Sequence, residues 1–346
     1  MCSLNRTNTH IKPDPLTNNR HYRYLCIEKY LLGDSSLKLG VSNLDQITTI
    51  GIAKDLEILL QKLAKVCQNL RGIILFCDSH SNVRITKQLE NTAIGLQKTI
   101  IAQNGFQWLR LYGSSAILFR FISNFDSSST TLRAIELNQV DLRLLESDNF
   151  VEALSFCENL RCLKITYCKN LDQQHWTEIA RFFKKLEYFS ISMTKEEIPV
   201  KFLEQIFISA GDNLKYLKID HNSNIASTIL DELLPYWYLY NLQALEMQGL
   251  NLKNAIVSLK TCKKLKHLTI YQDTINVNSS EVLNTLIKEL PTTLESLIVR
   301  NLSGINIAYS LVKEKESKRE NLNSYDVKTN VCVNYFYENI DPIYFK

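Results

Sequence analysis

Cysteines are the residues of this sequence whose type and spacing could do chemistry. Cys157, Cys162 and Cys168 lie within a stretch of twelve residues. A further cysteine, Cys77, stands three residues before His80. Thiolates and imidazoles at such spacings bind structural zinc, but a structural site needs four ligands from two close pairs. No second Cys-x-x-Cys or His-x3–5-His pair stands near either group, so we expect no metal site.

A thiol enzyme would need a histidine beside its cysteine as the general base. Cys162 is the thiol that we expect to face solvent, and no histidine stands at a facing position in the elements beside it. The sequence also lacks Gly-x-Ser-x-Gly and glycine-rich phosphate-loop motifs. Its histidines are scattered, at His10, His21, His80, His175, His221 and His267. We therefore expect a protein that is not an enzyme, with no catalytic residues and no cofactor.

The bulk composition is that of a soluble folded protein. The chain has 346 residues, of which 45% are hydrophobic and 22% are charged, and its formal net charge is +4. A charge this close to neutral does not favour nucleic acid or membrane surfaces as partners. Residues 1–20 lack the apolar core of a secretory signal, and no stretch is apolar enough to span a membrane. Nine cysteines, an odd number, are typical of reduced thiols in a cytoplasmic or nuclear protein.

The cysteines lie within a pattern that repeats along the chain. The pattern is L-x-x-L-x-L, in which each L is an apolar residue, and from Phe106 onward its copies begin 23 to 29 residues apart. Clear copies begin at Leu132, Leu160, Leu186, Leu214, Leu242, Leu265 and Leu294. Weaker copies begin at Tyr22, Leu44, Leu70 and Phe106. A period of about 20 to 29 residues with this spacing is the signature of leucine-rich repeats.

Strand geometry explains the spacing. Alternation puts the apolar residues of each copy on one face of a short strand, and parallel strands need crossover connections. Apolar residues three and four apart predict helices in residues 53–67 and 172–185. Serines at the start and Pro291 after the end predict a helix in 279–290. Repeated strand–helix units bury one continuous core. We therefore predict an α/β fold, a leucine-rich-repeat solenoid (horseshoe) of about 10 or 11 repeats, with parallel β-strands on the concave face and helices on the convex face.

The same frame gives several cysteines a structural position. Cys67, Cys157 and Cys262 each stand three residues before the first leucine of a copy. Cys168 stands at the ninth position of its copy, where the repeat accepts Asn or Cys. Both positions are turns, at which a small buried side chain fits. We interpret these four cysteines as packing residues.

This cysteine usage, with repeats of 26 residues, resembles the cysteine-containing subclass of leucine-rich repeats. That subclass is typical of F-box/leucine-rich-repeat proteins, the substrate receptors of SCF ubiquitin ligases. The closest match is "LRCLKITYCKNLDQQHWTEIARFFKKL", in which Cys168, Leu171 and Asp172 stand where that repeat has Cys, Ile or Leu, and Asp. The composition, rich in Asn, Lys and Ile, also resembles the expanded sets of such proteins in some fungi. The resemblance covers residues 21–311.

The resemblance implies an F-box, a helical module ahead of the repeats that binds the ligase adaptor. Residues 1–20 form a polar tail too short to be one, so we expect that the box was lost or that the sequence is truncated. After this tail we expect a leucine-rich-repeat domain at 21–311, and a charged linker with a C-terminal tail or cap at 312–346. The resemblance implies substrate recognition for a ubiquitin ligase. The alternative is a stand-alone interaction or regulatory protein.

The frame also identifies a candidate surface. The third, fifth and seventh residues of each copy should face the concave side, in rows whose neighbours are about 4.8 Å apart. These rows mix aromatic and charged residues, as protein-binding anchors do, although strand faces also favour aromatic residues for packing. We expect a protein target there, and a monomer outside its complex. The predicted protein-binding residues are Trp108, Arg110, Tyr112, Glu136, Cys162, Lys164, Tyr188, Tyr216, Lys218, Asp220, Glu246, His267, Tyr271 and Arg300.

Overall fold

The computed structural model describes the residues that build the repeating scaffold. They are 24–28, 46–50, 60–61, 64–65, 70–77, 87–103, 105–113, 131–145, 154–171, 174–193, 198–221, 239–248, 259, 262–272, 291–301 and 306–310. The predicted tail at 1–20 and the predicted C-terminal segment at 312–346 lie outside them. Within the described residues, no helix has the length and apolar character that crossing a membrane requires.

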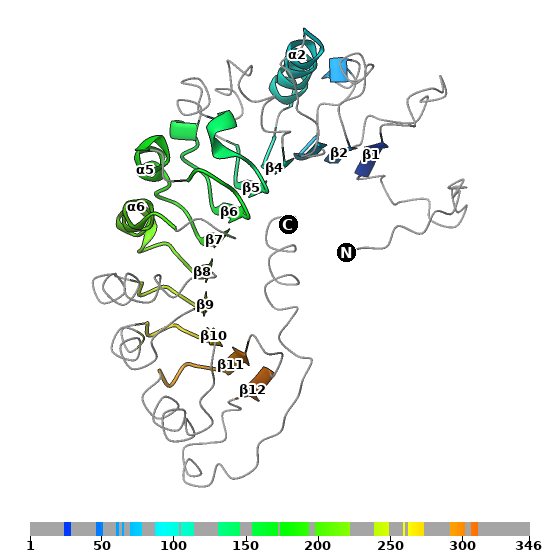
Figure 1. The fold of residues 1–346 in the computed structure, drawn as a ribbon. Coiled ribbons are helices and arrows are strands. Elements are labelled where there is room, and N and C mark those ends of the chain that lie inside the picture. Colours follow the sequence, from blue (N-terminus) through cyan, green and yellow to red (C-terminus); the bar gives the residue numbers. More distant parts are fainter. Residues whose placement is uncertain are drawn as a thin grey trace, which may run out of the picture.

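Twelve strands form one sheet, and they follow one another in chain order. Figure 1 shows them along the inner side of an open arc, with the helices on the outer side. Strands β1 to β11 pair in parallel, as an α/β solenoid requires. They are β1 (Tyr24–Glu28), β2 (Gln46–Ile50), β3 (Gly72–Cys77), β4 (Trp108–Gly113), β5 (Ala134–Asn138), β6 (Cys162–Thr166), β7 (Tyr188–Met193), β8 (Tyr216–His221), β9 (Ala244–Gln248), β10 (His267–Gln272) and β11 (Ser296–Asn301).

The repeated pattern decides where these strands begin. Each of β1 to β11 starts two residues after the first residue of a copy, including the weak copies at Tyr22 and Leu44. In the copies that form β3 to β10, the fourth and sixth residues are buried in the core. Leu163, the fourth residue in its copy, is 1% exposed and lies in register between Ile135 and Phe189. The apolar side chains of successive copies thus stack into one continuous core cluster.

Helices lie on the outer side of the sheet and contribute side chains to this core. They are α2 (Lys87–Ile101), α5 (Gln174–Ala180) and α6 (Val200–Ala210), with a short 3-10 helix, η3 (Leu142–Leu145). Helix α2 occupies the one long step between copies, from Leu70 to Phe106. The helix predicted at 53–67 is described only at four residues, all of them helical, and the one predicted at 279–290 lies outside the described residues.

The helix predicted at 172–185 is shorter in the structure, because its last residues are needed in a turn. Helix α5 ends at Ala180. The N–H of Phe183 donates to Ala180 O at 3.3 Å, and the N–H of Leu186 donates to Phe183 O at 3.2 Å. Phe183 is 1% exposed, so this turn buries an aromatic ring under the following strand.

The same turn occurs with cysteine in place of phenylalanine. The N–H of Leu160 donates to Cys157 O, and the N–H of Leu265 donates to Cys262 O, each at 3.0 Å. Both cysteines are buried. Their interpretation as packing residues is therefore confirmed, while Cys67 lies outside the described residues.

A second kind of turn follows the strands. Gly113, Gln139 and Tyr167 occupy the eighth position of three successive copies, and their φ angles are 58°, 54° and 54°. The chain thus bends through the left-handed region, which glycine reaches without steric cost. The next residue in the third copy is Cys168, whose buried Sγ lies 3.5 Å from Leu137 O. This position confirms Cys168 as a packing residue that ties one repeat to the preceding one.

The sequence pattern did not predict the last strand. Strand β12 (Asn306–Ser310) pairs antiparallel with β11, with Leu297 opposite Tyr309. It occupies the edge of β11 that would otherwise present unpaired backbone groups. The five residues of β12 lie beyond the last copy of the frame, so no repeat spacing marked them.

Replacing Leu163 with alanine tests the stacked core. The substitution should lower the free energy of unfolding by about 2 to 5 kcal/mol, because it leaves a cavity between two packed repeats. Arg181→Ala is the control, since this exposed residue should change the free energy by less than about 0.5 kcal/mol. Urea denaturation measures both. Equal effects of the two substitutions would contradict the assigned register.

Candidate protein-binding surface

The third, fifth and seventh residues of the copies form three rows on the solvent side of the sheet. We call them the first, middle and last concave rows. Strand register joins the first row from Trp108 through Ala134, Cys162, Tyr188, Tyr216, Ala244 and His267 to Ser296. The middle row contains Arg110, Glu136, Lys164, Ser190, Lys218, Glu246 and Thr269. The last row includes Tyr112, Asn138, Thr166, Ser192, Asp220, Tyr271 and Arg300.

The first row packs more tightly than its solvent-side position predicts. Trp108, Ala134, Cys162 and Tyr188 form a second apolar cluster, separate from the main core. The prediction that Cys162 faces solvent is wrong, because its side chain is 1% exposed. Small side chains at Ala134 and Cys162 lie between two large aromatic ones and are covered by them. Tyr216 extends this packing, with its ring centroid 6.2 Å from that of Tyr188.

Gly72 makes room for the first aromatic ring of this row. Gly72 and Trp108 are register partners on β3 and β4. A Cβ atom at position 72 would overlap the indole ring of Trp108. The glycine therefore lets the indole lie against the β3 backbone, where the tryptophan side chain is 7% exposed. Trp108 and Tyr188 therefore form the buried floor of the concave surface, and little of either side chain is accessible to a partner.

The middle row contains two ion pairs between neighbouring strands. Arg110 Nε lies 2.5 Å from Glu136 Oε2, and Lys218 Nζ lies 2.5 Å from Glu246 Oε1. Tyr271, in the last row, donates its hydroxyl to the same Glu246 oxygen at 2.5 Å. Exposed ion pairs of this kind stabilise a fold by about 0 to 1 kcal/mol. Glu246 is buried, and its contacts with Lys218 and Tyr271 offset the cost of burying its carboxylate. These pairs fix the positions of charged groups on the surface.

Polar contacts continue into the last row and the far end of the first. Ser192 Oγ donates to Asp220 Oδ2 at 3.2 Å, and His267 Nδ1 lies 2.9 Å from Ser296 Oγ. Partial burial lowers the pKa of His267. Burial likewise raises the pKa of the Tyr112 phenol. Arg300 continues the last row in register, but its side chain lies outside the described residues.

The thiols of Cys157 and Cys168 are buried. Burial raises the pKa of Cys157 and of Cys168 to about 12. A thiol that stays protonated at neutral pH is a poor nucleophile and a poor metal ligand. Over the residues that the structure describes, no group of three His, Cys, Asp or Glu side chains could hold a metal ion. Cys77 has no described side chain, and His80 lies outside the described residues.

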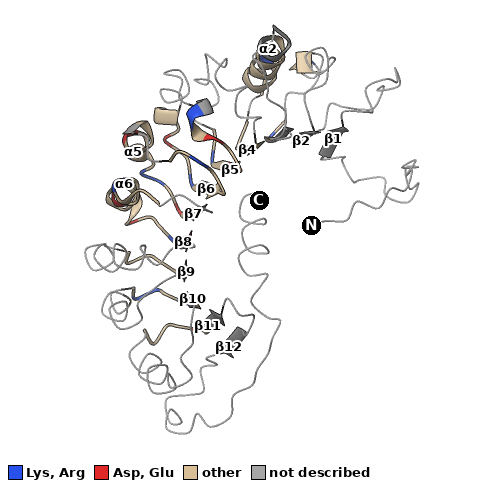
Figure 2. Ribbon diagram, viewed as in Figure 1, with Lys and Arg blue, Asp and Glu red and all other residues tan. Residues whose placement is uncertain are grey.

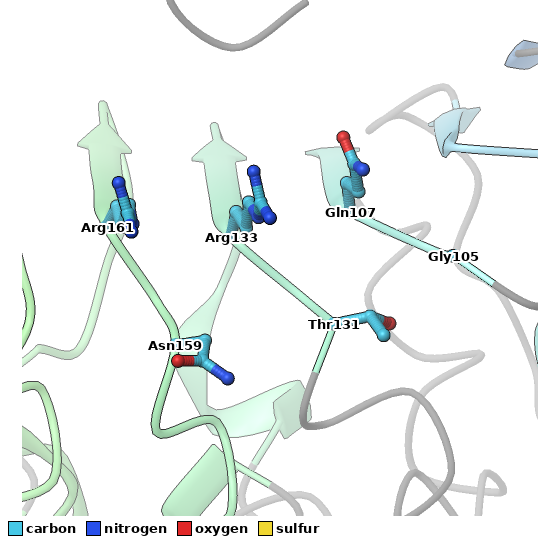
Figure 3. A pocket seen from close by; sticks show the side chains of 6 residues that line it. All are labelled: Gly105, Gln107, Thr131, Arg133, Asn159 and Arg161. Atoms are coloured by element: carbon cyan, nitrogen blue, oxygen red, sulfur yellow. The ribbon is translucent and has the colours of Figure 1, made fainter.

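A small polar pocket lies beside the residues that precede β4, β5 and β6, at the N-terminal ends of these strands. Its volume is about 220 Å³, and it is lined by Gly105, Gln107, Thr131, Arg133, Asn159 and Arg161. Figure 3 shows Arg161, Arg133 and Gln107 in a line at the beginnings of three neighbouring strands, with Asn159 and Thr131 below them. The sequence analysis missed this pocket. The available signal was arginine at the second position of two successive copies, "LRA" and "LRC".

Comparisons with known proteins give no assignment. No protein-family profile matches the chain, and no curated protein matches it in sequence. Among solved structures, the chain is similar to a Bacteroides fragilis protein determined as a structural genomics target. The two are 14% identical, and the match covers 79% of this chain and 70% of that one with a TM-score of 0.42. A likeness this loose carries no argument about function.

Thiol labelling tests the packing of the cysteines. In the native protein, Cys157, Cys162 and Cys168 should react with iodoacetamide at least about tenfold more slowly than in urea, because all three are buried. Mass spectrometry of the labelled peptides gives a rate for each cysteine. Native labelling of Cys162 at the rate of the unfolded chain would contradict the packed first row.

Two glycine substitutions test the contact between Gly72 and Trp108. Gly72→Ala should cost about 1 to 3 kcal/mol, since the added methyl group displaces a rigid ring. It should also change the tryptophan fluorescence. Gly105→Ala is the matched control, because a Cβ there meets no atom within 4 Å. Wild-type stability and fluorescence in Gly72→Ala would show that the indole does not lie on β3.

Proposed function

We propose that this chain is a leucine-rich-repeat protein whose concave rows bind another protein. The spacing of the apolar residues supports the assignment to leucine-rich repeats. Repeats of that class stack into a solenoid whose curvature creates an extended binding surface. The described scaffold has the properties that such a role needs, namely parallel strands in register and a core that leaves three side chains of each strand on the other face.

The observation that carries the proposal is the composition and continuity of the concave rows. The first and middle rows run in register from β4 to β11. Tyr216, Lys164 and Tyr271 are partly exposed above a packed floor that contains Trp108 and Tyr188. Tyrosine and charged side chains held in fixed positions are typical of the anchors in protein interfaces, because little conformational entropy is lost when they bind.

The proposed partner is a protein target of a ubiquitin ligase of the F-box type. The cysteines at turn positions support this lineage, since Cys157, Cys168 and Cys262 pack as that repeat subclass requires. Any transfer of ubiquitin would belong to partner enzymes. The second candidate is a stand-alone interaction or regulatory protein, which would use the same rows without a ligase adaptor.

Paired substitutions test the concave rows. Lys164→Ala with Tyr216→Ala should reduce capture of the bound protein by about tenfold or more, as the loss of interface anchors does. Lys201→Ala with Ile208→Ala is the matched control on α6, where Ile208 is 69% exposed on the outer side of the arc. Quantitative mass spectrometry of co-purified proteins measures capture, and thermal unfolding checks both folds. Loss of capture in the control pair alone would place binding on the outer face.

The same purification separates the two candidate functions. A ligase receptor should retain the ligase adaptor together with its target when the full-length transcript is expressed. A stand-alone protein should retain the target alone. Absence of the adaptor from a full-length preparation would remove the ligase assignment and leave the protein-binding role intact.

A further inference from the structure

The turns that lead into β6 to β10 form one rim of the arc. Because these strands are parallel, all of them begin at the same edge of the sheet. A backbone ladder fixes this edge. The N–H of Lys215 donates to Glu187 O, and the N–H of Lys266 donates to Gln243 O, each at 2.8 Å. We call residues 154–161, 181–187, 211–215, 239–243 and 262–266 the strand-start rim.

The strand-start rim carries an excess of positive charge. It contains eight lysines and arginines but only three carboxylates. The net charge of the whole chain is +4, so the rest of the chain is close to neutral. Figure 2 shows basic residues in the segments that lead into β7 and β10. The basic residues of the rim are Arg161, Arg181, Lys184, Lys185, Lys215, Lys263, Lys264 and Lys266.

Hydrogen bonds to neutral side chains hold two of these lysines at the rim. Lys185 Nζ donates to Asn159 Oδ1 at 2.9 Å, and Lys264 Nζ donates to Asn241 Oδ1 at 2.7 Å. Each bond crosses from one repeat to the preceding one. An amide oxygen positions an ammonium group without neutralising its charge. The two lysines are therefore held in place as exposed positive charges.

The carboxylates of the rim offset only part of this charge. Glu187 is shared between two cations, since its carboxylate lies 3.1 Å from Arg161 Nη1 and 2.6 Å from Lys215 Nζ. The side chains of Arg161 and Lys215 are 53% and 41% exposed, so both contacts are weak surface pairs. The rim thus keeps its positive excess.

Three large aromatic side chains are exposed among these charges. Phe156 is 48% exposed, Phe182 is 44% exposed and Tyr240 is 46% exposed. Phe156 and Phe182 occupy the same position in neighbouring repeats, four residues before the first leucine of a copy. The residue that follows each of them, Cys157 or Phe183, is buried and anchors the turn. Phenylalanine beside basic residues is typical of surfaces that lie at the interface of a lipid bilayer.

We propose that the strand-start rim binds the surface of a lipid bilayer that contains anionic phospholipids. The proposal goes beyond the protein-binding function and does not depend on it. Lysines are attracted to an anionic leaflet, and the phenyl rings enter the boundary between headgroups and acyl chains. Six of the eight basic residues are lysines, which act as point charges and suit a diffuse charged surface. The concave rows lie on the face of the sheet and stay open when its edge rests on a membrane.

Vesicle sedimentation of the full chain tests this proposal. The probes are vesicles of phosphatidylcholine alone and of phosphatidylcholine with about 30% phosphatidylserine. The protein should bind the anionic vesicles at least about tenfold more tightly, and added salt should weaken that binding. Equal binding to both kinds of vesicle, or binding to neither, would overturn the proposal.

Charge-matched substitutions assign the binding to the rim. Lys184→Gln with Lys185→Gln should weaken binding to the anionic vesicles by about tenfold or more, because each lysine near an anionic surface adds to the attraction. Lys98→Gln with Lys201→Gln is the matched control, since it removes the same charge from exposed positions on the outer helices α2 and α6. Equal effects of the two pairs, with thermal unfolding like the wild type, would show attraction by net charge alone and would overturn the assignment.

The aromatic rings and a competing polyanion complete the test. Phe156→Ser with Phe182→Ser should also weaken vesicle binding, while its dependence on salt stays as in the wild type, because ions do not screen an apolar contact. Wild-type affinity in this pair would contradict insertion of the rings. Tight binding of a fluorescein-labelled oligouridine, with no binding of anionic vesicles, would assign the rim to single-stranded nucleic acid and overturn the proposal. Because the vesicles contain no protein, either failure leaves the protein-binding role intact.

Discussion

Burial of the same two apolar positions in each repeat from β3 to β10 is the interaction on which the rest of the structure depends. Leu163 packs in register between Ile135 and Phe189, and each of these continues the ladder to the next repeat. Side chains alternate along a strand, so a slip of one residue would bury Lys164 and expose Leu163. The apolar ladder thus fixes the register of β3 to β10. A repeat has no complete core without its neighbours, which makes the scaffold cooperative along its length.

The surface follows from that register. Once Leu163 and Ile165 are buried, Cys162, Lys164 and Thr166 must lie on the opposite face of β6. Rows formed in this way bring together residues from separate repeats, as in the Lys218–Glu246 pair and the cluster around Trp108. The second residues of successive repeats, just before the strands, are aligned by the same rule. The core and the concave rows are two consequences of one spacing.

The spacing explains why strand positions were predictable and why other features were not. Even the weak copies at Tyr22 and Leu44 predicted β1 and β2, because a strand start depends only on local alternation. The exposure of Cys162 depends on the sizes of its neighbours in two other repeats, and these cover its thiol. The end of α5 depends on the turn that Phe183 enters. The pocket is lined by residues from three repeats, and no sequence motif marks these lining residues.

Site-specific photo-crosslinking tests the central claim, that the concave rows bind the partner, most directly. A photoreactive amino acid at Thr166 lies in the last concave row, and one at Ile208 lies on the outer side of the arc, on α6. The account predicts that the Thr166 position crosslinks to the captured protein and that the Ile208 position does not. Crosslinks from Ile208 together with none from Thr166 would contradict it.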